Sequence, residues 1–171
     1  MKLLFVIGSL QGGGAEHVLS TVCNNLAERG HNVILVHDFR WQVYHIVDKV
    51  RQIDVNAFEK DTTIGAFPQR ICNKILNRFR SYSFFKKIIK EDKPDVVTCF
   101  LQNWTWQLAL LCRGRVPLVY SERNTFDWDY NSLTDKLNKH IWYHFGDAIT
   151  TMTYYDKAYL RNTYKKVYVM H

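Results

Sequence analysis

The 171-residue sequence contains no long hydrophobic run and few prolines and cysteines. No stretch approaches the roughly 20 apolar residues that a helix needs to span a bilayer. Lys2 is the only charged residue before the first apolar run, residues 3–7, and this run is too short to predict a signal peptide. The four cysteines have no C-x-x-C spacing and lie in apolar stretches. We therefore expect a cytoplasmic protein whose thiols are buried and reduced, without a zinc site or disulfide framework. The cysteines are Cys23, Cys72, Cys99 and Cys112.

Acidic residues are absent from one part of the chain. Residues 64–90 contain seven Lys or Arg and no Asp or Glu, so this segment carries as much charge as the whole net excess of +7. Such a segment predicts attraction to an anionic partner: a membrane surface, phosphate groups or nucleic acid. No nucleic-acid recognition motif accompanies it, and we expect no nucleic-acid partner.

The same segment has the spacing of an amphipathic helix. Its apolar stripe consists of Ile71, Ile75, Phe79 and Tyr82, and its basic residues include Arg70, Lys74, Arg78, Lys86 and Lys87. This pattern is typical of a helix at a membrane interface, and also of a helix packed on a core with a solvated basic face. Both can hold together. We expect the apolar stripe to pack inward and those five basic residues to face an anionic membrane.

Short apolar runs alternate with helical patterns along the whole chain. Strands are expected at 3–7, 33–36, 96–101, 117–120, 148–152 and 167–170, with a less regular one at 50–55. Helices are expected at 15–27, 108–112, 133–145 and 153–160; Gly30 would end the first, and Thr153 with Asp156 would cap the last. This alternation predicts one α/β domain, a Rossmann-like, doubly wound, mostly parallel sheet with helices on both faces.

A glycine-rich turn follows the first strand, at the edge of the sheet where such folds bind ligands. It is not a P-loop, because Gly14 and Ala15 stand where Lys and Ser or Thr are required. The dinucleotide fingerprint is also incomplete, since His17 replaces its last glycine, although Asp38 stands where a ribose-binding acid would lie. A phosphate cradle, a weakened dinucleotide site and a turn that binds nothing all remain open.

Metal-site patterns are weak throughout. Asp127 and Asp129 spell D-x-D but follow a loop rather than a buried strand, and His140 and His144 lack the glutamate of H-E-x-x-H. We predict no metal site and no cofactor. Trp104 and Trp106 could frame an acceptor pocket, but a core or rim position is expected.

Five segments resemble glycosyltransferase family 4 in order and in spacing. They are GGGAEHVL (12–19), LAERGHNV (26–33), KPDVV (93–97), VPLVYSERN (116–124) and GDAIT (146–150). The fourth resembles the form found in bacterial polysaccharide-assembly members. The resemblance implies the N-terminal, acceptor-side half of a two-domain, retaining GT-B enzyme, covering residues 1–171, with the C-terminal nucleotide-sugar domain absent from this chain.

The resemblance also implies the activity and its partners. A hexosyl group would pass from a nucleotide-sugar, as substrate, to a glycan or lipid-linked acceptor on the inner face of a membrane. The chain would need its own C-terminal domain or a partner subunit, and alone it should be inactive. The alternatives are a non-catalytic, membrane-associated subunit of a split GT-B enzyme and a phosphate- or nucleic-acid-binding Rossmann domain.

Most candidate site residues come from the same motifs; Asn103 lies between the third and fourth segments. Gly14 matches the residue whose backbone N–H meets the donor diphosphate, and Gly13 would give the turn its conformational freedom. Arg123 stands where many members carry histidine; a guanidinium cannot shuttle protons at neutral pH, but it can bind an acceptor phosphate or stabilise leaving-group charge. Glu122 would orient Arg123 or an acceptor hydroxyl, or the two would form an internal network. The acceptor-binding candidates are Glu16, Asn103 and Asn124.

Overall fold

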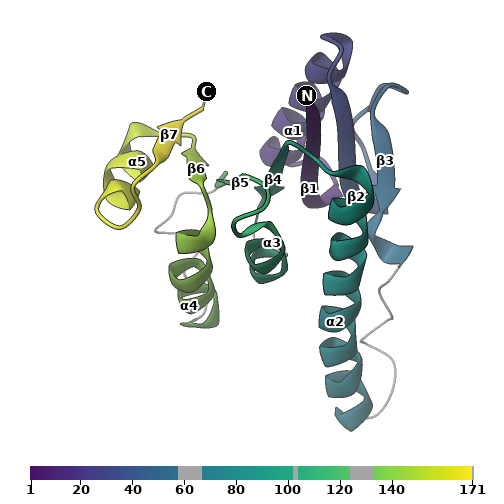
Figure 1. Cartoon of the computed structure of the whole chain (residues 1–171), viewed down its shortest axis with the longest axis vertical. Coiled ribbons are helices and arrows are strands. Elements are labelled where there is room, and N and C mark those ends of the chain that lie inside the picture. The colour runs from purple at the N-terminus through teal and green to yellow at the C-terminus, as the bar shows by residue number, and fades with distance from the viewer. Residues whose placement is uncertain (58–66, 102–103, 124–132, 171) are drawn as a thin grey trace.

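The computed structural model describes residues 1–57, 67–101, 104–123 and 133–170 (Figure 1). Its strands are β1 (Lys2–Leu10), β2 (Asn32–Gln42), β3 (Arg51–Asp54), β4 (Val96–Phe100), β5 (Leu118–Ser121), β6 (Ala148–Thr151) and β7 (Val167–Val169). Its helices are α1 (Gly14–Glu28), α2 (Phe67–Asp92), α3 (Thr105–Cys112), α4 (Leu133–Trp142) and α5 (Tyr154–Arg161). Two 3-10 turns, η1 (Val55–Ala57) and η2 (Tyr143–Phe145), complete the elements of the described residues.

The strands form one sheet in the order β3-β2-β1-β4-β5-β6-β7, and each neighbouring pair is parallel. The order reverses between β1 and β4, which makes the carboxyl ends of these two strands the topological switch point where such sheets bind ligands. The predicted Rossmann-like sheet is therefore confirmed, including its least regular strand, β3.

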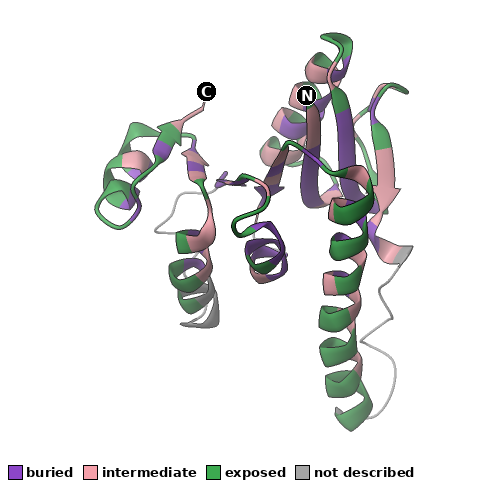
Figure 2. Ribbon diagram, viewed as in Figure 1, coloured by how far each residue is buried: buried purple, intermediate pink, exposed green. Residues whose placement is uncertain are grey.

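Helices cover both faces of the sheet because side chains alternate along each strand. Phe5 and Ile7 of β1 pack in a cluster with Leu19 and Cys23 of α1. Leu4 and Val6 point the other way, into a larger cluster that includes side chains of α2, α3, η2 and α5. Figure 2 shows the buried colour concentrated on the central strands and α3. The predicted caps are also present: Gly30 adopts φ +84 after α1, and Asp156 N donates to Thr153 Oγ1 (3.0 Å) at the start of α5.

Two of the family-like motifs act at the amino ends of the strands, away from the ligand edge. Lys2 N donates to Asp95 Oδ2 (2.7 Å), and Asp95 N donates to Lys2 O (2.8 Å). In the same way Leu118 N donates to Asp147 Oδ2 (2.9 Å), and Asp147 N donates to Leu118 O (2.8 Å). These carboxylates fix β4 against β1 and β6 against β5, so their part in the motifs is structural.

Two local expectations were wrong. The strand expected to reach Leu101 ends at Phe100, and Leu101 adopts a left-handed φ of 59°, which places strained backbone at the switch point. Cys72 is exposed on α2. The other thiols are buried as expected, and burial raises the pKa of Cys23, Cys99 and Cys112 to about 12, which makes them unreactive.

Helix α2 packs mainly through residues other than the predicted stripe, of which Tyr82 alone packs against the described core. Ser81, Phe85 and Ile88 are buried, and Ser81 Oγ accepts a hydrogen bond from Gln107 Nε2 (2.9 Å). Ile75 and Phe79 are 50% and 66% exposed instead. The reason is that the N-terminal half of α2 projects beyond the sheet and away from the hydrophobic clusters of the described residues (Figures 1 and 2). Of the helices in the described ranges, none is long and apolar enough to cross a membrane.

Candidate functional site

The glycine turn lies at the carboxyl end of β1, beside the switch point. Gly12 has φ +113, a value that side chains rarely allow, whereas Gly13 is the N-cap of α1 with φ −81 and ψ 169. The conformational freedom predicted for Gly13 therefore resides in Gly12. The helix begins at Gly14, where an added Cβ would meet nothing within 4 Å. The backbone at Gly14 is thus open to a ligand at the positive end of α1.

Glu16 closes the other side of this turn. Its carboxylate lies so close to Gly13 that a Cβ there would collide with Glu16 Oε2. A carboxylate in the first turn of a helix is stabilised by the helix dipole. An incoming anion would therefore approach at Gly14, away from the negative charge of Glu16.

A bulge of β2 flanks the glycine turn on the side away from β4. Ser9 pairs with Asp38 but the next residue, Leu10, pairs with Gln42, so residues 39–41 loop out of the register. Beyond the bulge, Val43 N donates to Leu10 O (2.9 Å) and the Tyr44 hydroxyl donates to Gly13 O (3.3 Å). The bulge and the glycine turn are therefore held together as one structure.

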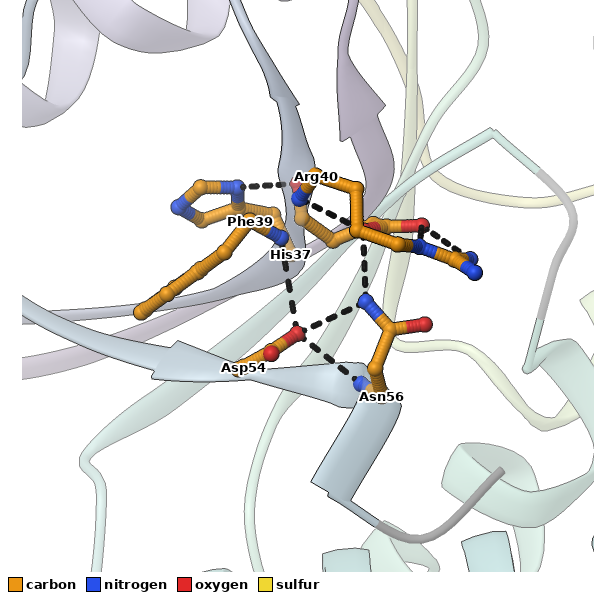
Figure 3. Close-up of polar contacts among 6 residues, drawn as sticks. His37, Phe39, Arg40, Asp54 and Asn56 are labelled. Carbon is orange, nitrogen blue, oxygen red and sulfur yellow. Dashed lines mark hydrogen bonds and ion pairs between the residues drawn. The ribbon is translucent and has the colours of Figure 1, made fainter. Parts of the chain in front are cut away.

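Polar contacts anchor the base of this bulge (Figure 3). The Asp38 carboxylate accepts from Arg40 N (2.8 Å), from Arg40 Nη2 (2.6 Å) and from Asn56 Nδ2. The hydrogen bond from the Arg40 side chain is the main cause that lowers the pKa of Asp38 to about 2, against the opposing effect of burial. Asp54 Oδ1 accepts from the backbone of Asn56 (2.9 Å) and of Phe39 (3.4 Å). The carboxylate suspected of binding a ribose is thus engaged within the protein.

Glu122 follows β5 and is buried, with 2% of its surface exposed. Its Oε2 lies 3.2 Å from Lys139 Nζ and accepts a hydrogen bond from the Tyr143 hydroxyl (2.6 Å). Burial, and next the charge of Glu122, raise the pKa of Tyr143 well above its usual 10. The tyrosine therefore stays protonated as a donor, and this buried ion pair ties the end of β5 to α4 and η2.

Arg123 is also buried, on a different set of partners. Its Nε donates to Ser121 Oγ (3.0 Å), its Nη1 donates to Met170 O (3.4 Å), and its guanidinium carbon lies 5.2 Å from the centre of the Phe100 ring. Burial lowers the pKa of Arg123 from its usual 12.5. Nη2 is buried and has no hydrogen-bond partner in the described part of the chain. The expected Glu122–Arg123 network is not formed, because adjacent residues of an extended chain point to opposite sides.

The sheet brings several predicted residues to one edge. Gly13, Gly14 and Glu16 follow β1, and Glu122 and Arg123 follow β5, while β4, with Phe100 at its end, lies between them. Asn103, Asn124, Asp127 and Asp129 lie outside the described residues. Arg70, Lys74, Arg78, Lys86 and Lys87 are exposed on α2.

Sequence reasoning missed Lys139 and Tyr143, although their spacing of one helical turn could have suggested a shared face. It also missed the bulge of β2. Trp104 is buried and Trp106 stacks on Tyr82 with ring centres 6.3 Å apart, so both belong to the packing, as expected. Among the residues whose placement is described, no group of three His, Cys, Asp or Glu could hold a metal ion.

Comparison with known proteins places this geometry in a family context. The model of Glycosyltransferase Family 4 matches residues 12–171. A curated relative from Campylobacter jejuni, "GalNAc-alpha-(1->4)-GalNAc-alpha-(1->3)-diNAcBac-PP-undecaprenol alpha-1,4-N-acetyl-D-galactosaminyltransferase", is 28% identical over 170 residues. The match covers 98% of this chain and 44% of that relative, so the chain spans less than half of the relative's length.

Solved structures support the fold. Sucrose-phosphate synthase from Thermosynechococcus elongatus is 12% identical with a TM-score of 0.69, covering 99% of this chain and 47% of that one. The lipopolysaccharide outer core galactosyltransferase WaaB is 13% identical with a TM-score of 0.65, covering 98% and 44%. The UDP-GlcNAc 2-epimerase from Methanocaldococcus jannaschii is 14% identical with a TM-score of 0.58, covering 99% and 45%. At these identities the likeness concerns the fold, which transferases and an epimerase share.

Proposed function

The chain belongs to glycosyltransferase family 4, and we propose that it is the acceptor-binding, N-terminal half of a GT-B enzyme that transfers a hexosyl group, N-acetylated or not, from a nucleotide-sugar to a lipid-linked glycan. The observation that carries this proposal is the unobstructed backbone of Gly14 at the start of α1. It supplies a place for the donor's diphosphate at the carboxyl edge of the sheet. The Campylobacter relative, named for transfer to a diphosphate-linked undecaprenol glycan, supports the acceptor class.

The charges around the edge agree with such a substrate. A nucleotide-sugar releases a nucleoside diphosphate, so negative charge grows on the leaving group during transfer. The positive end of α1 and the Arg123 guanidinium lie on the two sides of β4 at the same edge, and both stabilise negative charge. Glu16 confines that charge to the Gly14 side of the turn.

Substituting Gly14 by alanine tests the donor site. The methyl group would meet no atom of the described residues within 4 Å, so we expect the fold to be unchanged or stabilised by about 0.5–1 kcal/mol, as when glycine is replaced in a helix. The same methyl would stand between the backbone and an incoming phosphate. We expect the affinity of the intact protein for UDP, or for whichever of GDP, ADP and dTDP binds best, to fall at least tenfold by calorimetry, with transfer falling in parallel. Equal affinity in both proteins would remove the diphosphate from this turn.

The membrane proposal rests on α2. Its projecting half exposes apolar Ile71, Ile75 and Phe79 beside basic side chains, which is the arrangement of a helix seated in a lipid interface. We propose that this surface holds the protein on the anionic inner face of a membrane, next to a lipid-linked acceptor. Because Ile71, Ile75 and Phe79 are exposed instead of packed on the core, their side chains are available to lipid.

Charge reversal on α2 tests whether this surface binds the membrane. Each basic residue near an anionic leaflet contributes about 1 kcal/mol, so Arg70→Glu, Lys74→Glu and Arg78→Glu together should abolish flotation with phosphatidylglycerol vesicles. The matched control reverses Lys49, Lys165 and Lys166, which are exposed but lie outside α2, in connecting segments. It should retain most of the binding. Equal losses in the two triple variants would show that only net charge matters.

A further inference from the structure

The bulge of β2 displays aromatic side chains at the ligand edge that the proposed donor site does not use. Phe39 is 44% exposed and Trp41 is 57% exposed, in the part of β2 that lies out of register with β1. Bulges re-aim side chains and are frequent beside active sites. Solvent-exposed aromatic residues that follow one another on an anchored segment are typical of a binding surface.

The bulge is held rigid before any ligand arrives. Asp38 and Asp54 accept hydrogen bonds from the backbone of Arg40 and Phe39, respectively. The buried His37 ring lies 4.8 Å from the Phe39 ring, and His37 Nε2 is 2.9 Å from Gln52 Oε1. Figure 3 shows Phe39 and the Arg40 guanidinium pointing to opposite sides of the strand. A surface fixed in this way loses little conformational entropy on binding.

The charge of the bulge indicates a neutral ligand. Its one cation, Arg40, is paired with Asp38 through Nε and Nη2, at 3.1 and 2.6 Å, so the segment offers no net positive charge to a phosphate. The faces of aromatic rings carry the negative part of a quadrupole, and they attract the electron-poor C–H groups that line one side of a pyranose ring. This chemistry selects a saccharide over a nucleotide or a lipid phosphate.

We propose that Phe39 and Trp41 form a stacking ledge for the neutral sugar residues of the acceptor glycan. The ledge is continuous with the donor turn, since Val43 N bonds to Leu10 O and an added Cβ on Gly12 would lie 4.0 Å from Val43. A glycan lying on it would reach the switch point with its far sugars on the rings. This proposal rests on the proposed function, and it identifies the ledge as the subsite for the acceptor glycan.

Kinetics of the intact protein test the ledge. The double variant Phe39→Ala with Trp41→Ala should raise KM about tenfold for a polyprenyl diphosphate carrying three N-acetylhexosamine residues. The change should be at most twofold for the acceptor with one such residue, and kcat and donor KM should be unchanged. The matched control is Tyr168→Ala, an aromatic residue 54% exposed on β7, which should leave both KM values unaltered. Thermal unfolding of each variant confirms that surface substitutions have left the fold intact.

A direct binding experiment distinguishes failure of the ledge from failure of the proposed function. Free N-acetylhexosamine trisaccharide, titrated into the ¹⁵N-labelled chain, should shift one indole signal that disappears in Trp41→Ala. If the shift occurs and the intact protein transfers no sugar, the ledge stands and the transferase proposal fails. If the double variant binds and uses the glycan as the wild type does, the ledge is refuted. Loss of vesicle binding or of self-association on Trp41→Ala, without an effect on the glycan, would refute it as well.

Discussion

Replacing Lys139 by methionine is expected to lower the free energy of unfolding by about 3–5 kcal/mol, the usual cost of breaking a buried ion pair from one side. Lys139 and Glu122 are 2% and 1% exposed at their side chains and 3.2 Å apart. Without the ammonium, the carboxylate is left in the core with the Tyr143 hydroxyl as its remaining hydrogen-bond donor among the described residues. Within the described ranges Glu122 Oε1 already has no hydrogen-bond partner, so little compensation is available. Urea unfolding followed by circular dichroism measures the loss.

The double variant Lys139→Met with Glu122→Gln separates two contributions to the loss of stability: the unpaired charge of Glu122 and the lost packing of Lys139. Because the amide at position 122 is neutral, most of the loss should return, since replacing both partners of a buried pair is often close to neutral. Lys165→Met removes an exposed cation and should change stability by less than about 0.5 kcal/mol. A single variant as stable as this control would show that the Glu122–Lys139 pair contributes nothing in solution.

The sheet was predictable because its signal is local. The runs at residues 3–7 and 33–36 are apolar at every position, as strands covered on both faces must be, and glycine or proline interrupts the chain between several elements. The packing face of α2 was not predictable, because its sequence offers apolar residues on more than one side. Phe79 and Phe85 are equally apolar, and only the projection of half the helix past the sheet decides which of them is buried.

The candidate site also has parts that were predictable from the sequence and parts that were not. The glycine turn is contiguous in sequence, so its place at the start of α1 followed from the motif. Glu122 is adjacent to Arg123, yet its partner Lys139 comes from α4, because successive side chains of an extended segment point to opposite sides. The β2 bulge consists of three residues that fall out of register with β1. No residue type in this segment is specific enough to predict a bulge from the sequence. Pairings between distant elements are set by the tertiary structure.

Replacing Arg123 by alanine in the intact protein is expected to lower the transfer rate about 100-fold or more, the range found when one preorganised donor to developing charge is removed. Arg123 is only 5% exposed, but it lies at the carboxyl edge and presents Nη2 without a partner among the described residues. A buried guanidinium with an unsatisfied N–H donor destabilises the fold unless a ligand accepts a hydrogen bond from that donor. The phosphate of the donor or of the acceptor is the group that the proposed reaction supplies.

Two controls distinguish this role from a structural one. Ser121→Ala removes the acceptor of the Arg123 Nε hydrogen bond but keeps the guanidinium, so transfer should fall only a few-fold while stability falls as in Arg123→Ala. Arg123→Lys keeps the charge but loses the planar fork, so it should recover part of kcat without restoring the wild-type KM for the phosphate-bearing substrate. If Arg123→Ala transfers sugar within threefold of the wild type, Arg123 serves only to bind Met170, Ser121 and Phe100 together at the end of the sheet.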